Sequence, residues 1–483
     1  MTDSGAKGLI KNLNIWEAIG ISVALMAPSM AANINPQGTA TTVGRAVPVA
    51  FALATIGVLL VAYGFVRLTQ NFHHAGSVYG FVGATTGPRS GVVAGWGLIG
   101  TYIFYGCVTS MAAGIFGAKF LDEIGVWNNQ PDTAGFLVGA IALALAYFLA
   151  IVPARNGTRL LLTVEAVTVV LILITAFIVL SKLIGGTAPG GLGVDWSVFS
   201  IPKGTGGSTV FLGVVFGFLS FAGFEAAATL GEEAKNPRKD IPRAMLGTAI
   251  FGGVYFVFVT AVEVMGFGTN DAGVKAFISS GSLMGDLGTS YVGAWIGTII
   301  TLGAAVSAFG CALACVVGAS RMLFAIGRDS GSVALSSISS KNGTPTAATR
   351  VIVGAVALIV ILWALIGGAK PFDIFLGSGV IGTLILVAVY VLATIGAVKF
   401  LFFSGVKRAA SWEIIIPIAG LIVLIYTLYR NVIPFPASGP SRMYPIVSAL
   451  WLVVGLVAVW ARPAFTKKLG EKLLADENLS AAR

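Results

Sequence analysis

The sequence predicts an all-α integral membrane protein with about twelve transmembrane helices. Of its 483 residues, 56% are hydrophobic and only 10% are charged, whereas a soluble domain carries about 25% charged residues. Many apolar runs are long enough to cross a hydrocarbon core of about 30 Å. These observations exclude a soluble multidomain protein. The 63 glycines agree, because small residues let membrane helices pack closely.

Polar segments separate the apolar runs and set the order of the predicted helices along the chain. Most runs are about 20 residues long, as a helix that crosses a bilayer requires. We predict the spans at 15–38, 45–66, 91–119, 135–153, 160–183, 208–230, 244–267, 292–320, 350–369, 373–399, 412–430 and 444–461.

Basic residues indicate the orientation of these spans. If the N-terminus is cytoplasmic, most of the 30 basic residues lie on the cytoplasmic side, as the positive-inside rule requires. The segment MTDSGAKGLIKNLN does not resemble a cleaved signal, so the first span acts as the insertion signal. We expect a multi-pass protein of the inner (plasma) membrane with both termini cytoplasmic. The net charge of +10 then indicates contact with anionic lipid rather than with nucleic acid.

Two spans are interrupted in the same manner. In the first span, GISVALMAPSMAANINPQG places Pro28 near the middle, and in the sixth, FLSFAGFEAAAT places Gly223 and Glu225 there. The breaks are five spans apart, so the two halves run in opposite directions across the membrane, which is typical of an inverted repeat. The alternative is an ordinary proline kink and a close-packing glycine. The predicted regions are 1–14 (cytoplasmic segment), 15–183 (first repeat), 205–400 (second repeat), 412–461 (two further helices) and 462–483 (cytoplasmic tail).

A broken membrane helix leaves backbone groups without partners, which is tolerated where they line a cavity or bind a ligand. N–H groups at the start of a half-helix attract a carboxylate, and exposed carbonyls suit an ammonium group or a cation. A site with both suits an amino acid zwitterion. The predicted walls are Met26, Ala27, Pro28, Ser29 and Met30 from the first span, and Ser220, Phe221, Ala222, Gly223 and Phe224 from the sixth.

Glu225 lies at or just past the second break. A carboxylate in hydrocarbon is costly unless it faces a cavity or a partner. Its functional interpretation is a proton-titrating group or a latch on the unwound segment; the alternative is a carboxylate permanently bonded to the amides of the break. Glu263 on the seventh span and Glu165 on the fifth are further candidates, but each lies closer to a span edge.

The cysteines and histidines predict neither a disulfide nor a metal centre. Cys107, Cys311 and Cys315 all lie in apolar runs, and the last two share one helix face, which suits packing residues. A metal-binding pair is the alternative, without a nearby acidic residue or histidine to complete it. His73 and His74 lie in a charged turn, where we expect them to face water.

Three segments resemble the amino acid–polyamine–organocation superfamily. GFEAAATLGEEAKNPRKDIPRA (223–244) is similar to that family's sixth span and following loop. HHAGSVYGFV (73–82) is similar to its Pro-x-x-Gly-x-x-Tyr signature, with His74 or Ala75 where a proline is usual. ASRMLFAIGRDS (319–330) is similar to the end of its eighth span. The likeness covers about residues 10–400, and its sixth-span motif is the most specific.

The resemblance implies a five-plus-five core with broken helices 1 and 6, two additional C-terminal helices, and an amino acid permease. Such a secondary active transporter moves an amino acid or related amine by alternating access, by proton or sodium symport, or by antiport. It needs no cofactor, and its partners are a small-molecule substrate and membrane lipid. The resemblance is compatible with either a monomer or a homodimer.

The family's Gly-Ser/Thr-Gly break falls here on Met26-Ala27-Pro28. Since proline has no N–H, one donor for a substrate carboxylate is missing. Ser29 compensates, or the substrate is a polyamine or another decarboxylated amine. Phe221 matches the family's aromatic position, whose ring covers the substrate; simple packing is the alternative.

The resemblance leaves the coupling ion open between H⁺ and Na⁺. Some relatives carry a lysine in the fifth span that substitutes for sodium, and this position falls on Thr168, with no lysine nearby in the span. A sodium site of the related kind would use carbonyls near Ile21 and Ala24 with the hydroxyl of Ser307. The alternative for Ser307 is a hydroxyl bonded back to its own helix.

Two other classes of function compete with transport. A membrane-embedded enzyme would need a nucleophile, base or metal constellation, and the sequence shows no such spacing, no Walker-type loop and no soluble catalytic domain. A channel would show repeated pore-facing charges or a symmetric carbonyl filter. The sequence therefore favours a transporter that is not an enzyme.

Overall fold

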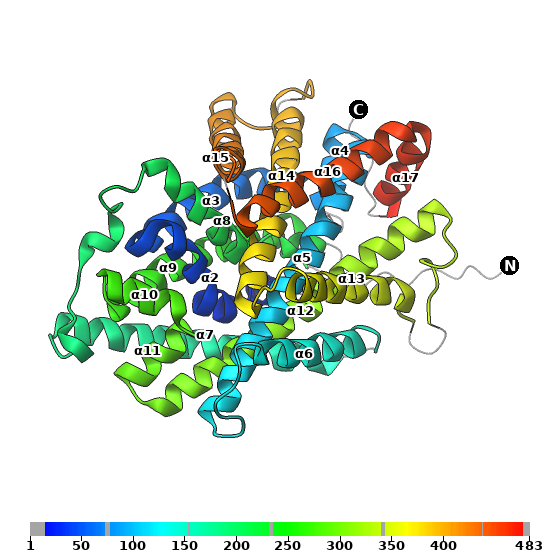
Figure 1. The fold of residues 1–483 in the computed structure, drawn as a ribbon. Helices are drawn as coiled ribbons and strands as arrows, with labels where there is room; N and C mark the ends of the chain where they lie inside the picture. Colours follow the sequence, from blue (N-terminus) through cyan, green and yellow to red (C-terminus); the bar gives the residue numbers. More distant parts are fainter. Residues whose placement is uncertain are drawn as a thin grey trace.

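The protein is built from helices (Figure 1). The structure, a computed structural model, describes residues 15–72, 78–152, 155–230, 235–339, 343–406, 408–436 and 438–476. Within these ranges it contains no β-strand. Ten helical stretches of the described chain are long and apolar enough to cross a membrane, and Ala134–Ala150 is a shorter apolar helix. The prediction of an all-α membrane protein with many spans is therefore confirmed.

The first half of the chain follows the predicted order of spans. Proline begins two of its helices, at Pro28 and Pro88, where the missing N–H costs no intrahelical hydrogen bond. The long helices are α1 (Ile15–Met26), α2 (Pro28–Val43), α3 (Val47–Asn71), α5 (Pro88–Glu123), α6 (Ala134–Ala150) and α7 (Arg155–Ile184).

The second half also matches the predicted spans to within several residues. Pro237 and Pro371 begin α9 and α14 in the same way as in the first half. The helices are α8 (Val210–Phe221), α9 (Pro237–Phe267), α12 (Ala294–Ser330), α13 (Thr346–Leu365), α14 (Pro371–Phe402), α15 (Ile415–Val432) and α16 (Met443–Ala461).

Four shorter helices lie outside the predicted spans. α4 (Val78–Thr86) follows the second span, and α10 (Asp271–Ser279) and α11 (Leu283–Tyr291) connect the seventh span to the eighth. α17 (Pro463–Asp476) forms from the expected polar tail. It buries Leu469, Leu473 and Leu474 against neighbouring helices that include α4 and α5. Figure 1 shows α10 and α11 at one end of the molecule and α17 at the other.

The centre of the molecule is formed by α2, α5, α8, α12 and α14 (Figure 1). In the most apolar stretch of α5, 83% of the residues are buried, against 17% in α16. α16 therefore leaves most of its apolar side chains exposed on the outside of the bundle. Close helix contact depends on small residues: a Cβ atom at Gly114 of α5 would lie 2.1 Å from the carbonyl oxygen of Gly135 on α6.

Candidate functional site at two interrupted helices

The first interruption lies between α1 and α2. α1 ends at Met26, and Ala27 adopts left-handed backbone angles (φ 46°, ψ 56°) before α2 begins at Pro28. Only glycine visits this region without cost, so Ala27 stores backbone strain. The structure places this interruption inside the segment 26–30 that the sequence singled out.

The second interruption follows α8. The helix ends at Phe221, four non-helical residues follow, and a 3₁₀ helix (Ala226–Leu230) begins after them. Gly223 has φ +102°, which L-residues rarely adopt. A Cβ atom there would also lie 3.1 Å from the carbonyl carbon of Leu25.

The two interruptions lie against one another. The Ala227 N–H donates a 3.0 Å hydrogen bond to Ser22 Oγ of α1, and Gly223 packs on Leu25. The side chain of Asn35 on α2 donates a 2.7 Å bond to Ser220 Oγ on α8. Segments almost 200 residues apart in the chain therefore form one unit.

A cavity of about 520 Å³ opens beside both interruptions. Five of the predicted site residues line it: Met26, Met30, Ala222, Gly223 and Glu225. The remaining wall comes mainly from α5 and α12, including Thr101, Tyr102, Tyr105 and Thr109 of α5 and Cys311 and Cys315 of α12. The sequence did not identify α5 as a wall, because its polar residues are single hydroxyls within a long apolar run.

Other predicted wall residues lie behind this surface. Phe221 is 1% exposed, and its ring meets that of Phe256 edge-on at 5.5 Å. Phe224 packs on Phe65 and Tyr390. The cavity lining also excludes Ala27, Pro28, Ser29 and Ser220. In this conformation Phe221 is a packing residue, and a role as a cover over substrate stays a prediction.

Glu225 is half-buried and lines the cavity. Its carboxyl lies close to the backbone amides of Gly223 and Glu225 itself and beside the Tyr390 phenol. Oε2 of Glu225 and the hydroxyl of Tyr390 nevertheless have no well-aligned hydrogen-bond partner. Oε2 of Glu225 is therefore an unbonded acceptor beside the second interruption.

The first interruption is held by a carboxyl group from another helix. Ser29 N–H donates a 2.8 Å bond to Oε1 of Glu165 on α7, and Met30 N–H donates a 3.2 Å bond to Ser307 Oγ on α12. The Tyr255 hydroxyl donates to Pro28 O at 3.4 Å. The N-terminal end of a helix attracts negative charge, and the Glu165 carboxyl lies at this end of α2.

Sequence reasoning ranked Glu165 below Glu225 because Glu165 is closer to a span edge. The missed signal is helical spacing: Glu165 precedes Thr168 by three residues, so both lie on one face of α7. Thr168 itself bonds back to Val164 O at 2.8 Å and packs against Gly303 of α12. The third acidic candidate, Glu263 on α9, is fully buried, and neither of its carboxyl oxygens has a partner among the described residues.

A second cavity of about 610 Å³ reaches Glu165 and Ser307. It lies between α6, α7 and α12 and is lined further by Val152, Thr344 and Arg321. Leu25 and Arg321 line both cavities. Glu165 is thus open to a cavity, although only 5% of its surface is exposed.

The predicted sodium ligands lie on α1 and α12, and the sodium site itself stays a prediction. Ile21 and Ala24 lie within α1, whose helix continues to Met26, and their side chains lie outside the described part. Ser307 Oγ already accepts the Met30 N–H. This hydrogen bond uses one of the two lone pairs of the hydroxyl oxygen. Among the described residues, no group of three His, Cys, Asp or Glu side chains could hold a metal ion.

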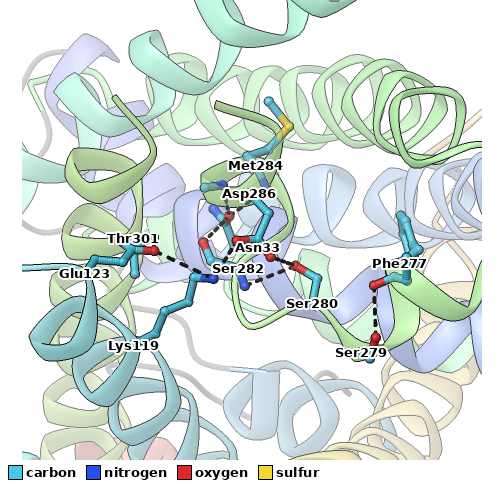
Figure 2. Close-up of polar contacts among 12 residues, drawn as sticks. Asn33, Lys119, Glu123, Phe277, Ser279, Ser280, Ser282, Met284, Asp286 and Thr301 are labelled. Atoms are coloured by element: carbon cyan, nitrogen blue, oxygen red, sulfur yellow. Dashed lines mark hydrogen bonds and ion pairs between the residues drawn. The ribbon is translucent and has the colours of Figure 1, made fainter. Parts of the chain in front are cut away.

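Asn33 connects α2 to the α10–α11 end of the molecule, as Figure 2 shows. Its Oδ1 accepts from Ser282 Oγ and Met284 N at 2.9 Å and from Gly285 N at 3.3 Å. Its amide nitrogen donates to Ser29 O at 2.8 Å. One side chain therefore links the first interruption to the α10–α11 connection.

An ion pair reinforces the same end (Figure 2). Lys119 Nζ lies 2.5 Å from Asp286 Oδ1, and Ser280 Oγ donates to Asp286 Oδ2 at 2.6 Å. Gln37 of α2 donates to the carbonyl oxygens of Phe277 and Ser280. Together these contacts tie α2 and α5 to the α10–α11 connection.

Comparisons with known proteins agree with this arrangement. The sequence pattern of the family described as amino acid permease matches residues 16–468. The branched-chain amino acid permease BcaP of Bacillus subtilis is 26% identical, with 79% of each chain covered. The low-affinity putrescine importer PlaP of Escherichia coli K12 is 25% identical over 74% of this chain and 76% of its own. An uncharacterised transporter of Mycobacterium tuberculosis is 27% identical over 95% of this chain and 93% of its own.

Proposed function

The chain belongs to the amino acid permease family, and from that premise we propose that it moves an amino acid or related amine across the cytoplasmic membrane by alternating access. It is a membrane transporter rather than an enzyme by family. The substrate occupies the cavity beside the two interruptions. One side of that cavity is formed by five residues that the sequence predicted for the site: Met26, Met30, Ala222, Gly223 and Glu225.

One observation carries this proposal: two broken helices and an acidic residue line the same cavity in a bundle of apolar helices. Irregular backbone persists within a membrane where it lines a cavity. Transporters place substrate sites where two discontinuous helices meet near the bilayer midplane. A purely structural membrane bundle has no such requirement.

The helices support a twelve-span topology. The stretch Pro28–Asn71 turns at Gly44 (φ 56°), so it contributes to two spans. Counting it twice and including Ala134–Ala150 raises the ten candidate stretches of the described chain to twelve. We propose that these form inverted repeats at 15–183 and 205–400, with both termini cytoplasmic.

In this orientation the conformation faces inward. The cavity is lined by Tyr79, Arg321 and Met322, which the charge pattern puts at the cytoplasmic side. At the other end, Asn33 and Lys119 hold the outer closure. Substrate would enter after these contacts open and leave in the conformation described here.

We propose a proton as the coupling ion, with Glu165 as the group that carries it. Its carboxyl bonds the start of α2 and faces the second cavity, so protonation would weaken a contact between two moving elements. Tyr255 is the titratable neighbour that interacts with it electrostatically. Ser307 lies beside Glu165, and its oxygen already accepts the Met30 N–H, which makes it a weaker ligand for sodium.

Uptake into liposomes tests the proposal. Purified protein should accumulate labelled amines or amino acids when a proton gradient is imposed, and protein-free liposomes should not. Replacing the proton gradient by a sodium gradient separates the two ions. A protein that neither accumulates nor exchanges any member of either class would contradict transport.

A further inference from the structure

The backbone donors at the first interruption are already used by the protein. Pro28 has no N–H, Ser29 donates to Glu165, and Met30 donates to Ser307. Ala31 N–H donates to Ala27 O at 2.8 Å and so begins the ladder of α2. The start of a helix binds an anion through free N–H groups. From Pro28 to Ala31 none of these donors is free.

Most backbone donors of the second interruption are also used by the protein. Ala222, Phe224, Ala226 and Ala228 donate to carbonyl oxygens within the segment. Ala227 donates to Ser22 Oγ. The amides of Gly223 and Glu225 face the Glu225 carboxyl. A carboxylate that entered between the two interruptions would find only these two amides, next to the like charge of Glu225, so the loss of its water would be poorly compensated.

The cavity instead presents a hydrogen-bond acceptor. Glu225 supplies the only carboxyl group among its described lining residues, and Oε2 of this group is buried without a partner. An unpaired buried oxygen of this kind is costly unless a ligand bonds it. An ammonium group has three donors and a positive charge, so it suits this oxygen.

Arg321 is the single basic residue of the described lining, and it lies too far from Glu225 to bind the carboxylate of the same ligand. Arg321 lies ten residues beyond Cys311 on α12, which corresponds to about 15 Å along the helix. Cys311 contacts Leu25 O beside the first interruption, with its sulfur 3.8 Å away. An α-amino acid carries its two charged groups on the same carbon atom, a spacing too short to reach both Glu225 and Arg321.

The rest of the wall suits an uncharged body. Much of it is aliphatic, aromatic or sulfur-containing: Met26, Met30, Leu98, Tyr102, Cys315 and Leu386. Methionine side chains adapt to apolar ligands of different shape. A second ammonium group would find no second carboxyl among the described lining residues, so one positive charge suits this site better than two.

We propose that the substrate is an organic monoamine: an ammonium group on a short apolar body, without an α-carboxylate. The ammonium group binds Glu225, and the lining offers no partner beside it for a substrate carboxylate. This inference rests on the proposed transport function and specifies the chemical class that the same cavity takes.

Matched pairs of ligands test the inference on the wild-type protein. Each pair differs by one carboxylate: 3-methylbutylamine against leucine, 2-phenylethylamine against phenylalanine, and putrescine against ornithine. Binding is measured by calorimetry, and transport by counterflow in liposomes. We expect the amine to bind about 100-fold more tightly than its amino acid, as for sites that leave a ligand's polar group unpaired, with the monoamines ahead of putrescine.

The outcomes separate the two proposals. Transport of leucine or phenylalanine with equal or greater affinity than the amines would overturn the inference and leave transport intact. Preferential binding of putrescine would overturn the single-charge assignment. If no member of any pair moves or exchanges, both the inference and the transport function are contradicted.

Variants test whether the preference for the amine depends on the Glu225 carboxyl. Glu225→Gln should abolish the preference for the amine by lowering its affinity about 100-fold, while Glu471→Gln, a surface change on α17, should leave it unchanged. An unaltered preference in Glu225→Gln would refute the assignment, and a melting temperature close to that of wild type verifies that each variant is folded.

Discussion

The two interruptions are each paired with a carboxyl group, but they acquire it differently. At the second, Glu225 belongs to the broken segment itself and lies over its own amides. At the first, Glu165 comes from α7 and reaches across to Ser29 at 2.8 Å. A cap within one segment moves with that segment, whereas a contact between two helices can form and break. The comparison assigns substrate binding to Glu225 and coupling to Glu165.

The backbone differs between the interruptions as well. Gly223 has φ +102° and touches Leu25, so its conformation and its lack of a side chain are both required. Ala27 has φ 46° with a methyl group that the buried site accommodates. The second interruption therefore tolerates substitution less well than the first.

Gly223→Ala should have the largest effect. The new methyl group would meet the Leu25 carbonyl carbon at 3.1 Å, and alanine is strained at φ +102° by about 1–3 kcal/mol. We expect transport to fall at least tenfold with a lower melting temperature. Ala27→Ser, a small change at the other interruption, serves as the comparison. Normal transport by Gly223→Ala would show that the second interruption needs no special backbone.

Glu165→Gln should separate coupling from binding. The amide keeps the shape and an oxygen that accepts from Ser29, but it cannot take up a proton. We expect amine affinity to stay within about twofold, and accumulation driven by a proton gradient to be lost while exchange continues. Uptake at a series of pH values measures this. Proton-driven accumulation by the variant would exclude Glu165 as the coupling group.

Asn33→Ala should disturb the outer closure that is linked to the first interruption. The variant loses the acceptor of three hydrogen bonds from Ser282, Met284 and Gly285. Each buried donor left without a partner costs about 1–3 kcal/mol. We therefore expect a larger outward-open population. Labelling of a cysteine introduced at Ser282 from the outside reports this, and an unchanged labelling rate would contradict a gating role.

Ala27→Gly should have the smallest effect. Glycine relieves the left-handed strain of about 1–2 kcal/mol, but it also adds freedom to the unfolded chain, which offsets about 0.4–1 kcal/mol. A net gain in stability of up to about 1 kcal/mol follows, with transport unchanged. Thermal unfolding of the purified variant measures it, and a marked loss of stability would contradict the strain.

The sequence was sufficient to predict the helical membrane fold and the positions of the two interruptions. Pro28 and the Gly223–Glu225 segment interrupt a helix through their own backbone properties, which can be recognised in the sequence without knowledge of tertiary contacts. The order of spans follows from hydropathy in the same way. The C-terminal polar tail was less predictable, because α17 forms where Leu469 and its neighbours find a partner surface.

The roles of individual side chains depended on contacts that sequence patterns do not contain. Glu165 looked peripheral, yet its helix face meets the start of α2. Phe221 looked like a wall residue, yet its ring turns toward Phe256. The direction of a side chain at a helix end depends on which helix packs there, and that is set by the whole bundle.

The native cysteines allow the most direct test of the cavity. Cys311 and Cys315 line it, whereas Cys107 is buried elsewhere and its sulfur lies 3.8 Å from Val356 O. Modification of each thiol by a small methanethiosulfonate reagent is followed by mass spectrometry, with and without a transported amine. We predict that the amine slows modification of Cys311 and Cys315, and that Glu225→Gln abolishes this protection. Equal rates with and without a saturating amine would show that the substrate binds elsewhere.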